Sequence, residues 1–276
     1  MMKNFLENSA QHDICATCGT RYPGARTATD SCPICLDERQ YVGDNGQVWT
    51  SYQALAKGRS IRFEELTPML FVLQPVPSLA IGQRAHLIHS EAGNILWDCI
   101  PFLDEPAVAY IRSLGGLKAI AISHPHYYSM MVDWATAFDC PVYLHEADRE
   151  WVMHPSDRIQ FWRGDRKPLW DDMALVHVGG HFAGGTILYH PQFQNKGALF
   201  TGDCIFVARD RKSVSFMYSY PNMIPLGQQA IRFIEAQVAP LQYDAIYGAF
   251  EGQIIPADAQ AAVRRSIDRY LSIVGT

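Results

Sequence analysis

The sequence lacks any segment typical of a membrane protein. An uncharged stretch from Leu66 to Gln83 carries Pro68, Pro75 and Pro77, and prolines inside an apolar helix break it. The first residues, MMKNFLENSAQHD, have no apolar core of the kind that a secretory signal peptide needs. We therefore expect neither a membrane span nor a signal peptide, and we predict a cytoplasmic protein.

Positive charge is also scarce. The chain has 23 Lys and Arg residues against 28 Asp and Glu, which gives a formal net charge of -5. Nucleic-acid binding requires a positive field, so this balance argues against a nucleic-acid partner. By contrast, 48% of the residues are apolar and the length is 276 residues, which suits one mid-sized domain with a large core and a small appendage.

The cysteines are seven in number, and an odd count without a secretion signal indicates a reducing compartment, where paired cysteines hold metal more often than each other. Cys15 and Cys18 form one Cys-x-x-Cys pair, and Cys32 and Cys35 form a second. Four thiolates complete a tetrahedral structural site, and Gly19 allows the backbone angles of the first turn. We predict a four-cysteine zinc module over residues 1–46, followed by the main domain over residues 47–276.

This module resembles zinc ribbons and also the rubredoxin-like modules of rubrerythrins, which share Cys-x-x-Cys-Gly-x-x-Tyr (Cys15 to Tyr22) and Cys-Pro-x-Cys. The second resemblance implies iron and electron transfer, and tetrahedral thiolates accept either metal. Leu36 stands where rubredoxin modules usually have glycine, which favours zinc. We expect a structural role or a docking role toward a protein partner or a second copy of the chain.

The remaining sequence alternates strands and helices. Residues 84–98 predict a hairpin with a turn at residues 92–94. A helix capped by Asp104 is expected to end at residues 115–116. Other predicted elements are strands at residues 119–123, 141–145, 175–178, 186–190, 198–201 and 245–247, and helices at 129–138, from 146, and from about 256 to the end.

Polar residues follow several of these strands at their ends. His124 and His126 follow one strand, His181 follows another, and Asp203 follows a third. Strand ends can meet at one edge of a sheet, so these residues are candidate metal ligands. His145, at another strand end, is the further histidine that we expect nearest to such a site.

These motifs, in their order, resemble those of the metallo-β-lactamase-fold hydrolases. The matching stretches are Ile95 to Asp98, His124-x-His126, Gly179 to Thr186 around His181, and Thr201-Gly-Asp203. The resemblance covers residues 65–255 and implies an α/β fold, a four-layer αββα sandwich. It also implies that His124, His126 and His181 form one metal position, with Asp203 as the bridging carboxylate.

The second metal position of that family has lost its ligands here. Tyr128 and Ser129 occupy the places of its Asp and His, and residues 247–252, YGAFEG, contain no final histidine. Neutral phenol and hydroxyl groups bind a divalent cation poorly. We therefore expect a single ion, zinc or another divalent metal.

Three histidines around one zinc ion are the ligand set of a catalytic site. We predict a hydrolase of a small ester, lactone or thioester, in which Asp203 binds the metal or accepts a proton and Tyr128 donates a hydrogen bond to the substrate. Two alternatives stay open. In the first, the fold has lost catalysis and the protein serves binding or regulation, with the zinc ion of the four cysteines as its only metal. In the second, the four-cysteine module binds iron and transfers electrons.

Overall fold

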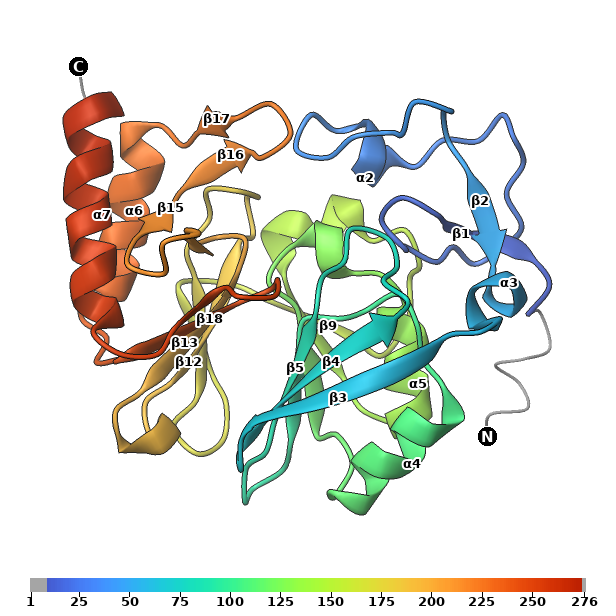
Figure 1. Ribbon diagram of the computed structural model, residues 1–276, viewed down its shortest axis with the longest axis horizontal. Coiled ribbons are helices and arrows are strands. Elements are labelled where there is room, and N and C mark those ends of the chain that lie inside the picture. Colours follow the sequence, from blue (N-terminus) through green and yellow to red (C-terminus); the bar gives the residue numbers. More distant parts are fainter. Residues whose placement is uncertain (1–8, 275–276) are drawn as a thin grey trace. The chain divides into compact units, whose positions relative to one another are not determined.

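The computed structural model describes residues 9–274, which form two units by their internal contacts. Unit 1 comprises Met1–Leu144 and Glu150–Gln160, and unit 2 comprises His145–Arg149 and Phe161–Thr276. Each unit carries one large sheet and its own helices (Figure 1). Among the helices of the described residues, none has the length and apolar character needed to cross a membrane.

The sheet of unit 1 begins with a long antiparallel hairpin and continues into short, buried parallel strands. Its strands, in spatial order, are β3 (Ser60–Thr67), β4 (Leu70–Val76), β5 (Ala85–Ile88), β6 (Ile95–Trp97), β7 (Ala119–Ala121), β8 (Val142–His145) and β9 (Ile159–Trp162). The β6, β7 and β8 strands run parallel. All residues of β6 and β7 are buried, as expected where helices cover parallel strands.

Helices α4 and α5 make the crossovers between these parallel strands, α4 (Glu105–Ser113) between β6 and β7 and α5 (Met131–Phe138) between β7 and β8. Asp104 caps α4, because its carboxylate accepts a hydrogen bond from the Ala107 amide at 2.8 Å. Between β7 and α5 lies a single 3-10 turn, η1 (Pro125–Tyr127). This turn places the two histidines of the first motif directly after a buried strand.

The cysteine-rich segment of unit 1 has little regular structure. Its elements are β1 (His12–Cys15), α2 (Pro33–Leu36), β2 (Trp49–Ser51) and α3 (Tyr52–Ala56). The β1 and β2 strands pair antiparallel, so residues on both sides of position 46 share one small ladder. The division at residue 46 stays a prediction.

The sheet of unit 2 has six strands, and all neighbours are antiparallel except β13 and β18. In spatial order they are β10 (Arg166–Pro168), β11 (Ala174–His177), β12 (Thr186–His190), β13 (Ala198–Gly202), β18 (Ala245–Gly248) and β19 (Ile254–Ile255). Two small ladders, β14 (Phe206–Val207) with β15 (Val214–Ser215) and β16 (Met217–Ser219) with β17 (Ile224–Pro225), follow β13 in the chain.

Two helices, α6 (Gln228–Val238) and α7 (Ala259–Val274), lie side by side and pack on this sheet (Figure 1). Their buried residues, among them Ile231, Ile234, Val263 and Ile267, share a core with Leu199 and other strand residues. The remaining short helices are the 3-10 segments η2 (Glu146–Trp151) and η3 (Phe193–Asn195).

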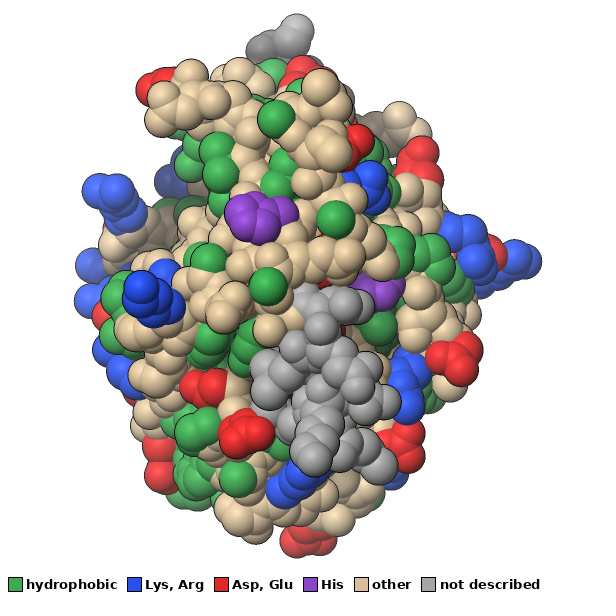
Figure 2. All heavy atoms as spheres, turned by 90° about the vertical axis from the view of Figure 1, so that its right-hand side faces the viewer, with side chains coloured by type: hydrophobic (Ala, Val, Ile, Leu, Met, Phe, Trp, Pro, Cys, Tyr) green, Lys and Arg blue, Asp and Glu red, His purple; other side chains and the backbone are tan. Residues whose placement is uncertain are grey.

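Most predicted elements are confirmed within two or three residues at their ends. The hairpin of residues 84–98 is β5 with β6, the capped helix is α4, and the C-terminal helix is α7. The helix expected from residue 146 is a kinked 3-10 segment because Asp148 leaves the helical region. On the face drawn in Figure 2, basic and acidic side chains are interspersed, in keeping with the balanced charge of the chain.

Candidate metal centres

Four cysteines of unit 1 come together at one point. Cys15 ends β1, Cys18 lies in the turn that follows, Cys32 precedes α2 and Cys35 lies within it. Their sulfurs all lie within 4.8 Å of one another, and the Cys15–Cys35 and Cys18–Cys32 sulfurs are 3.7 Å apart. A tetrahedral site with metal–sulfur bonds of about 2.3 Å has sulfurs ~3.8 Å apart. The predicted four-cysteine cluster is confirmed, and its geometry fits one tetrahedral ion.

The backbone of the first turn explains why glycine follows Cys18. The Gly19 amide donates to the Cys15 carbonyl at 2.8 Å, and Gly19 has a φ of +76°. A Cβ atom here would lie 2.1 Å from Cβ of Pro101. Glycine is therefore required both by the left-handed backbone and by the close approach of Pro101.

Side chains around the cluster lie within hydrogen-bond distance of sulfur. The Gln47 amide lies 3.2 Å from the Cys15 sulfur, and the Thr20 hydroxyl lies 3.2 Å from the Cys18 sulfur. The pKa of the Cys15 thiol is well below its usual value, because the thiol of Cys18 and those of the other two cysteines can donate to its thiolate. Such donors stabilise the thiolate form, which is the form that binds a metal ion.

Apolar and aromatic residues enclose the four-cysteine cluster. All four cysteines are buried, and they share a small core with Tyr22, Ile34 and Trp49. The Tyr22 and Trp49 rings meet edge to face with centroids 5.0 Å apart, and the guanidinium of Arg26 lies 4.2 Å from the Tyr22 ring. Four ligands inside a closed shell are the pattern of a structural site, because no position is left for a substrate.

The second candidate set begins in unit 1 with His124 and His126, at the end of β7. Both are buried, their ring centroids are 5.0 Å apart, and a ring nitrogen of one lies within 4.8 Å of a ring nitrogen of the other. Nδ1 of His124 is 2.9 Å from the Ser123 hydroxyl. When Nδ1–H donates to this oxygen, Nε2 carries the lone pair that can bind a metal ion.

Asp98 supports this histidine from the end of the neighbouring strand. Its carboxylate accepts a hydrogen bond from the Ser123 amide at 2.8 Å, and its own amide donates to the Ala121 carbonyl. The side chain is fully buried. Asp98 therefore fixes the backbone next to His124. The sequence shows Asp98 at the end of a predicted strand but does not reveal this role.

Tyr128 and Ser129, which replace ligands of the family pattern, are both buried. Ser129 has a φ of +40°, its hydroxyl lies 3.0 Å from the amide nitrogen of Gln83, and its carbonyl accepts from the Arg21 amide at 3.1 Å. Ser129 thus holds together parts of unit 1. Tyr128 ends the 3-10 turn η1, and its amide donates to the Pro125 carbonyl.

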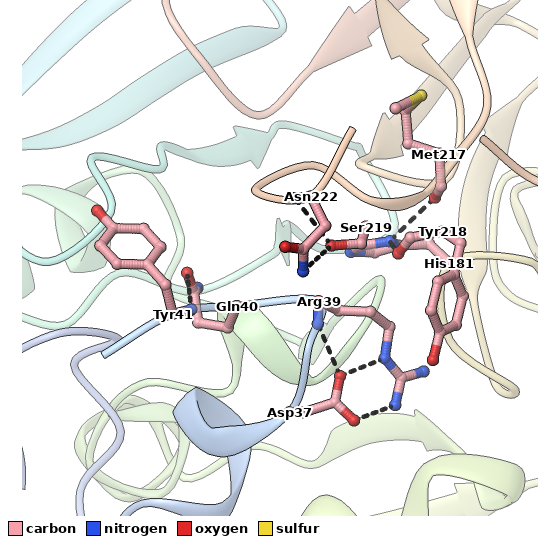
Figure 3. A network of polar contacts seen from close by, with 9 residues as sticks. All are labelled: Asp37, Arg39, Gln40, Tyr41, His181, Met217, Tyr218, Ser219 and Asn222. Atoms are coloured by element: carbon pink, nitrogen blue, oxygen red, sulfur yellow. Dashed lines mark hydrogen bonds and ion pairs between the residues drawn. The ribbon is translucent and has the colours of Figure 1, made fainter. Parts of the chain in front are cut away.

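Unit 2 holds a pair of candidate ligands of its own, His181 and Asp203. Both are buried, and a ring nitrogen of His181 lies within 4.8 Å of a carboxylate oxygen of Asp203. Nδ1 of His181 is 2.9 Å from the Tyr218 carbonyl and 3.2 Å from that of Met217 (Figure 3). A carbonyl only accepts, so Nδ1 carries the proton and Nε2 is the available ligand atom.

The loop that carries His181 has glycine where no side chain fits. A Cβ atom at Gly185 would lie 2.4 Å from the Gly179 carbonyl oxygen. The Gly179 amide donates a hydrogen bond to the Gly185 carbonyl at 2.9 Å. A Cβ atom at Gly184 would lie 2.7 Å from Asp148, whose carboxylate accepts from the Gly184 amide at 2.7 Å. The buried Asp148 is a supporting residue that was not predicted, since no motif spacing marks it.

His145, expected near the site, lies in unit 2 against another histidine. Its ring stacks on His177 with centroids 4.1 Å apart and planes 5° from parallel, and Trp162 meets it edge on. Burial, together with His177, lowers the pKa of His145. These contacts with His177 and Trp162 pack the His145 ring within unit 2.

Comparison with known proteins identifies the fold. No protein-family model matches the sequence. The DIM-1 metallo-β-lactamase aligns over 78% of this chain and 97% of its own, with 15% identity and a TM-score of 0.56. FIM-1 of Pseudomonas aeruginosa, solved in a mono-zinc form, aligns over 78% and 95%, with 12% identity and a TM-score of 0.53. The predicted α/β class, the metallo-β-lactamase fold with an N-terminal four-cysteine module, is confirmed.

One relative places the chain in a family. The sequence is 43% identical over 266 residues to YmaE of Bacillus subtilis (strain 168), an uncharacterized protein, and the match covers 95% of this chain and 97% of the relative. The chain belongs to the YmaE family, and it has the metallo-β-lactamase fold.

Proposed function

We propose that this chain is a metal-dependent hydrolase in which His124, His126, His181 and Asp203 bind one divalent ion. The observation that carries the proposal is that each unit holds two buried side chains of ligand type within 4.8 Å of each other. In each unit, one histidine has its Nδ1 hydrogen-bonded, which leaves Nε2 for an ion. Three imidazoles are the protein ligands of a catalytic zinc site, and with Asp203 as a fourth ligand the ion can still take water or substrate by expanding to five-coordinate.

A single ion is favoured over two. The second position would have to use Tyr128, Ser129 and the aromatic residues near the C-terminus. Ser129 already takes part in two hydrogen bonds of unit 1, and Tyr247 stacks on Phe200 with centroids 5.1 Å apart. FIM-1, which shares the fold, was solved in a mono-zinc form. Phosphodiester chemistry that needs two ions is therefore not proposed.

The substrate class we propose is a small ester, lactone or thioester. A divalent ion at this site would act as a Lewis acid toward the acyl carbonyl. Asp203 accepts a proton from the attacking water, and one of its carboxylate oxygens lies within 4.8 Å of a His181 ring nitrogen. Tyr128 donates its hydroxyl proton as a hydrogen bond to the oxygen on which negative charge develops.

For the four-cysteine cluster we propose a structural zinc ion. Its four sulfurs are buried in an aromatic shell and offer no open position. Iron with electron transfer is the alternative, since the same sulfurs accept it. The proposed partners are a small-molecule substrate at the histidine site and, through the four-cysteine module, a protein partner or a second copy of the chain.

Metal analysis of protein purified without added metal tests these proposals together. We expect about two zinc ions per chain and a colourless solution. The double variant His124→Ala with His126→Ala should lose one zinc ion and lose hydrolysis of 4-nitrophenyl acetate and of a thioester panel. His89→Ala is the matched control, because His89 is an exposed histidine of the same unit.

Three results would contradict these proposals. Retention of both zinc ions by the double variant would refute the proposed histidine site. One zinc per chain in the wild type, without turnover of any ester, would support a binding or regulatory protein that has lost catalysis. A red, iron-containing sample that bleaches on reduction would support electron transfer.

A further inference from the structure

The four-cysteine module touches the loop that carries His124 and His126, and both lie in unit 1. The Arg21 amide, three residues after Cys18, donates to the Ser129 carbonyl at 3.1 Å. The Arg21 guanidinium donates to Asp133 at 2.8 Å and to Asp13 at 3.0 Å. Asp133 lies in the first turn of α5, directly after the loop.

This contact is buried and has little freedom. The side chains of Arg21, Asp13 and Asp133 are only 8%, 4% and 11% exposed. A buried guanidinium between two carboxylates is favourable only when its geometry is well satisfied, and loss of one partner leaves an uncompensated charge. The main effect of these ion pairs is therefore to fix the position of Arg21, and not to raise the free energy of unfolding.

A further contact braces the same loop. Gln83 donates to the Ser129 hydroxyl at 3.0 Å. Ser129 is held in a left-handed conformation that non-glycine residues rarely adopt. The short turn from His124 to Ser129 is thus fixed at its far end by a segment that belongs to the four-cysteine module.

We propose that Arg21 is a positioning residue that couples the four-cysteine centre to metal binding by His124 and His126. An ion on the cysteines fixes the turn from Cys15 to Arg21, and Arg21 then fixes the loop at Ser129 and Asp133. Coupling between two binding sites is reciprocal, so each ion favours the binding of the other. This inference rests on the proposed function, because it requires that the histidines bind a metal ion.

The variant Arg21→Gln tests the coupling, because glutamine keeps the backbone amide and a polar side chain but removes both ion pairs. Arg158→Gln is the control, since Arg158 also pairs at 2.8 Å with an aspartate of unit 1, the exposed Asp139 at the end of α5. Cobalt loading reports the cysteine site through its intense thiolate charge-transfer band. Competition with a chromophoric chelator gives the zinc affinity of the histidine site.

In Arg21→Gln the thiolate band should persist, while the zinc affinity of the histidine site should fall by ~10- to 100-fold, the usual effect of losing an outer-shell support. Hydrogen exchange in residues 124–133 should become faster, with no change in α4. Arg21→Lys, which keeps the charge, should recover part of the affinity. Wild-type affinity and wild-type exchange in Arg21→Gln would overturn the inference.

The experiment separates this inference from the proposed function. If the wild type shows no second zinc-binding step, the histidine site is refuted, and the inference in the form stated fails with it. If the second step is present in the wild type and unchanged in Arg21→Gln, the hydrolase proposal stands and only the coupling is refuted.

Discussion

The two candidate metal sites differ in how far apart their ligands lie in the chain. The cysteines span Cys15 to Cys35 and are brought together by one strand end, one turn and one short helix of unit 1. The histidines and Asp203 span residues 124–203, with one pair in each unit. Spacing in the sequence alone predicts the cysteine cluster, whereas each pair of the second set depends on the fold of its own unit.

The surroundings of the two sites differ as well. The sulfurs lie in an aromatic and apolar shell, with Gln47 and Thr20 at hydrogen-bond distance. The histidines lie beside polar supports, namely Ser123 for His124 and backbone carbonyls for His181. A closed thiolate shell favours a structural ion, and supported imidazoles favour an ion that exchanges ligands with a substrate.

The largest expected effect is at the local site. The double variant Cys15→Ser with Cys18→Ser should lose one zinc ion per chain, and the four-cysteine module should unfold, because structural zinc contributes on the order of 10 kcal/mol to the folding of such modules. Zinc content and limited proteolysis within residues 16–48 measure both losses.

Cys140→Ser is the control for that variant. Cys140 is buried and lies outside the four-cysteine cluster, and burial raises the pKa of its thiol to about 12, as for an inert cysteine. It should keep both zinc ions. Intact zinc content and protease resistance in the double variant would show that the cysteines do not hold a structural ion.

A smaller effect is expected in the loop of unit 2 that carries His181. Gly185→Ala places a methyl group 2.4 Å from the Gly179 carbonyl oxygen, a backbone atom that cannot move away alone. The free energy of unfolding should fall by about 1–3 kcal/mol, the range for overpacking. The affinity for a zinc ion that His181 binds should fall as well. Urea unfolding and zinc titration test this.

Gly43→Ala is the matched control, because nothing lies within 4 Å of a Cβ atom at Gly43. It should change the free energy of unfolding by no more than a few tenths of a kcal/mol. An equal effect of both substitutions would mean that the close approach at Gly185 does not constrain the loop.

The sequence identified the local features well. The Cys-x-x-Cys spacing predicted the cluster, and the buried run before His124 predicted β7. Capping by Asp104 predicted the start of α4, because the cap is a local hydrogen bond. These successes share one cause, which is that the interactions act between residues close in sequence.

The missed features depend on contacts between distant residues. Arg21 pairs with Asp133 across 112 positions, and Asp148 holds Gly184 across 36. The hairpin of β3 and β4 was not predicted, since Pro75 lies inside β4 and no residue of β3 is fully buried. No local pattern marks a side chain whose partner is chosen by the fold.

The smallest expected effect concerns the link between the four-cysteine module and α5. Burial raises the pKa of Asp133 from its ordinary value of 3.8 to about 6, although Arg21 opposes this. A carboxyl group with a raised folded-state pKa contributes stability that is fully present below its unfolded pKa and is lost as the pH rises through about 6. Acidification through this window therefore favours the folded state at this residue.

Comparison of the wild type with Asp133→Asn isolates this contribution, because the other titrating groups are common to both proteins. Between pH 7 and pH 5 the free energy of unfolding of the wild type should rise by about 1 kcal/mol relative to the variant. Urea unfolding at both pH values provides the measurement. A difference that is independent of pH would mean that the pKa of Asp133 is the same in the folded and unfolded states, and a difference that grows toward pH 7 would mean that its folded-state pKa is the lower one. In the second case the Arg21 ion pair would outweigh burial, and acidification would lower the free energy of unfolding of the wild type relative to the variant.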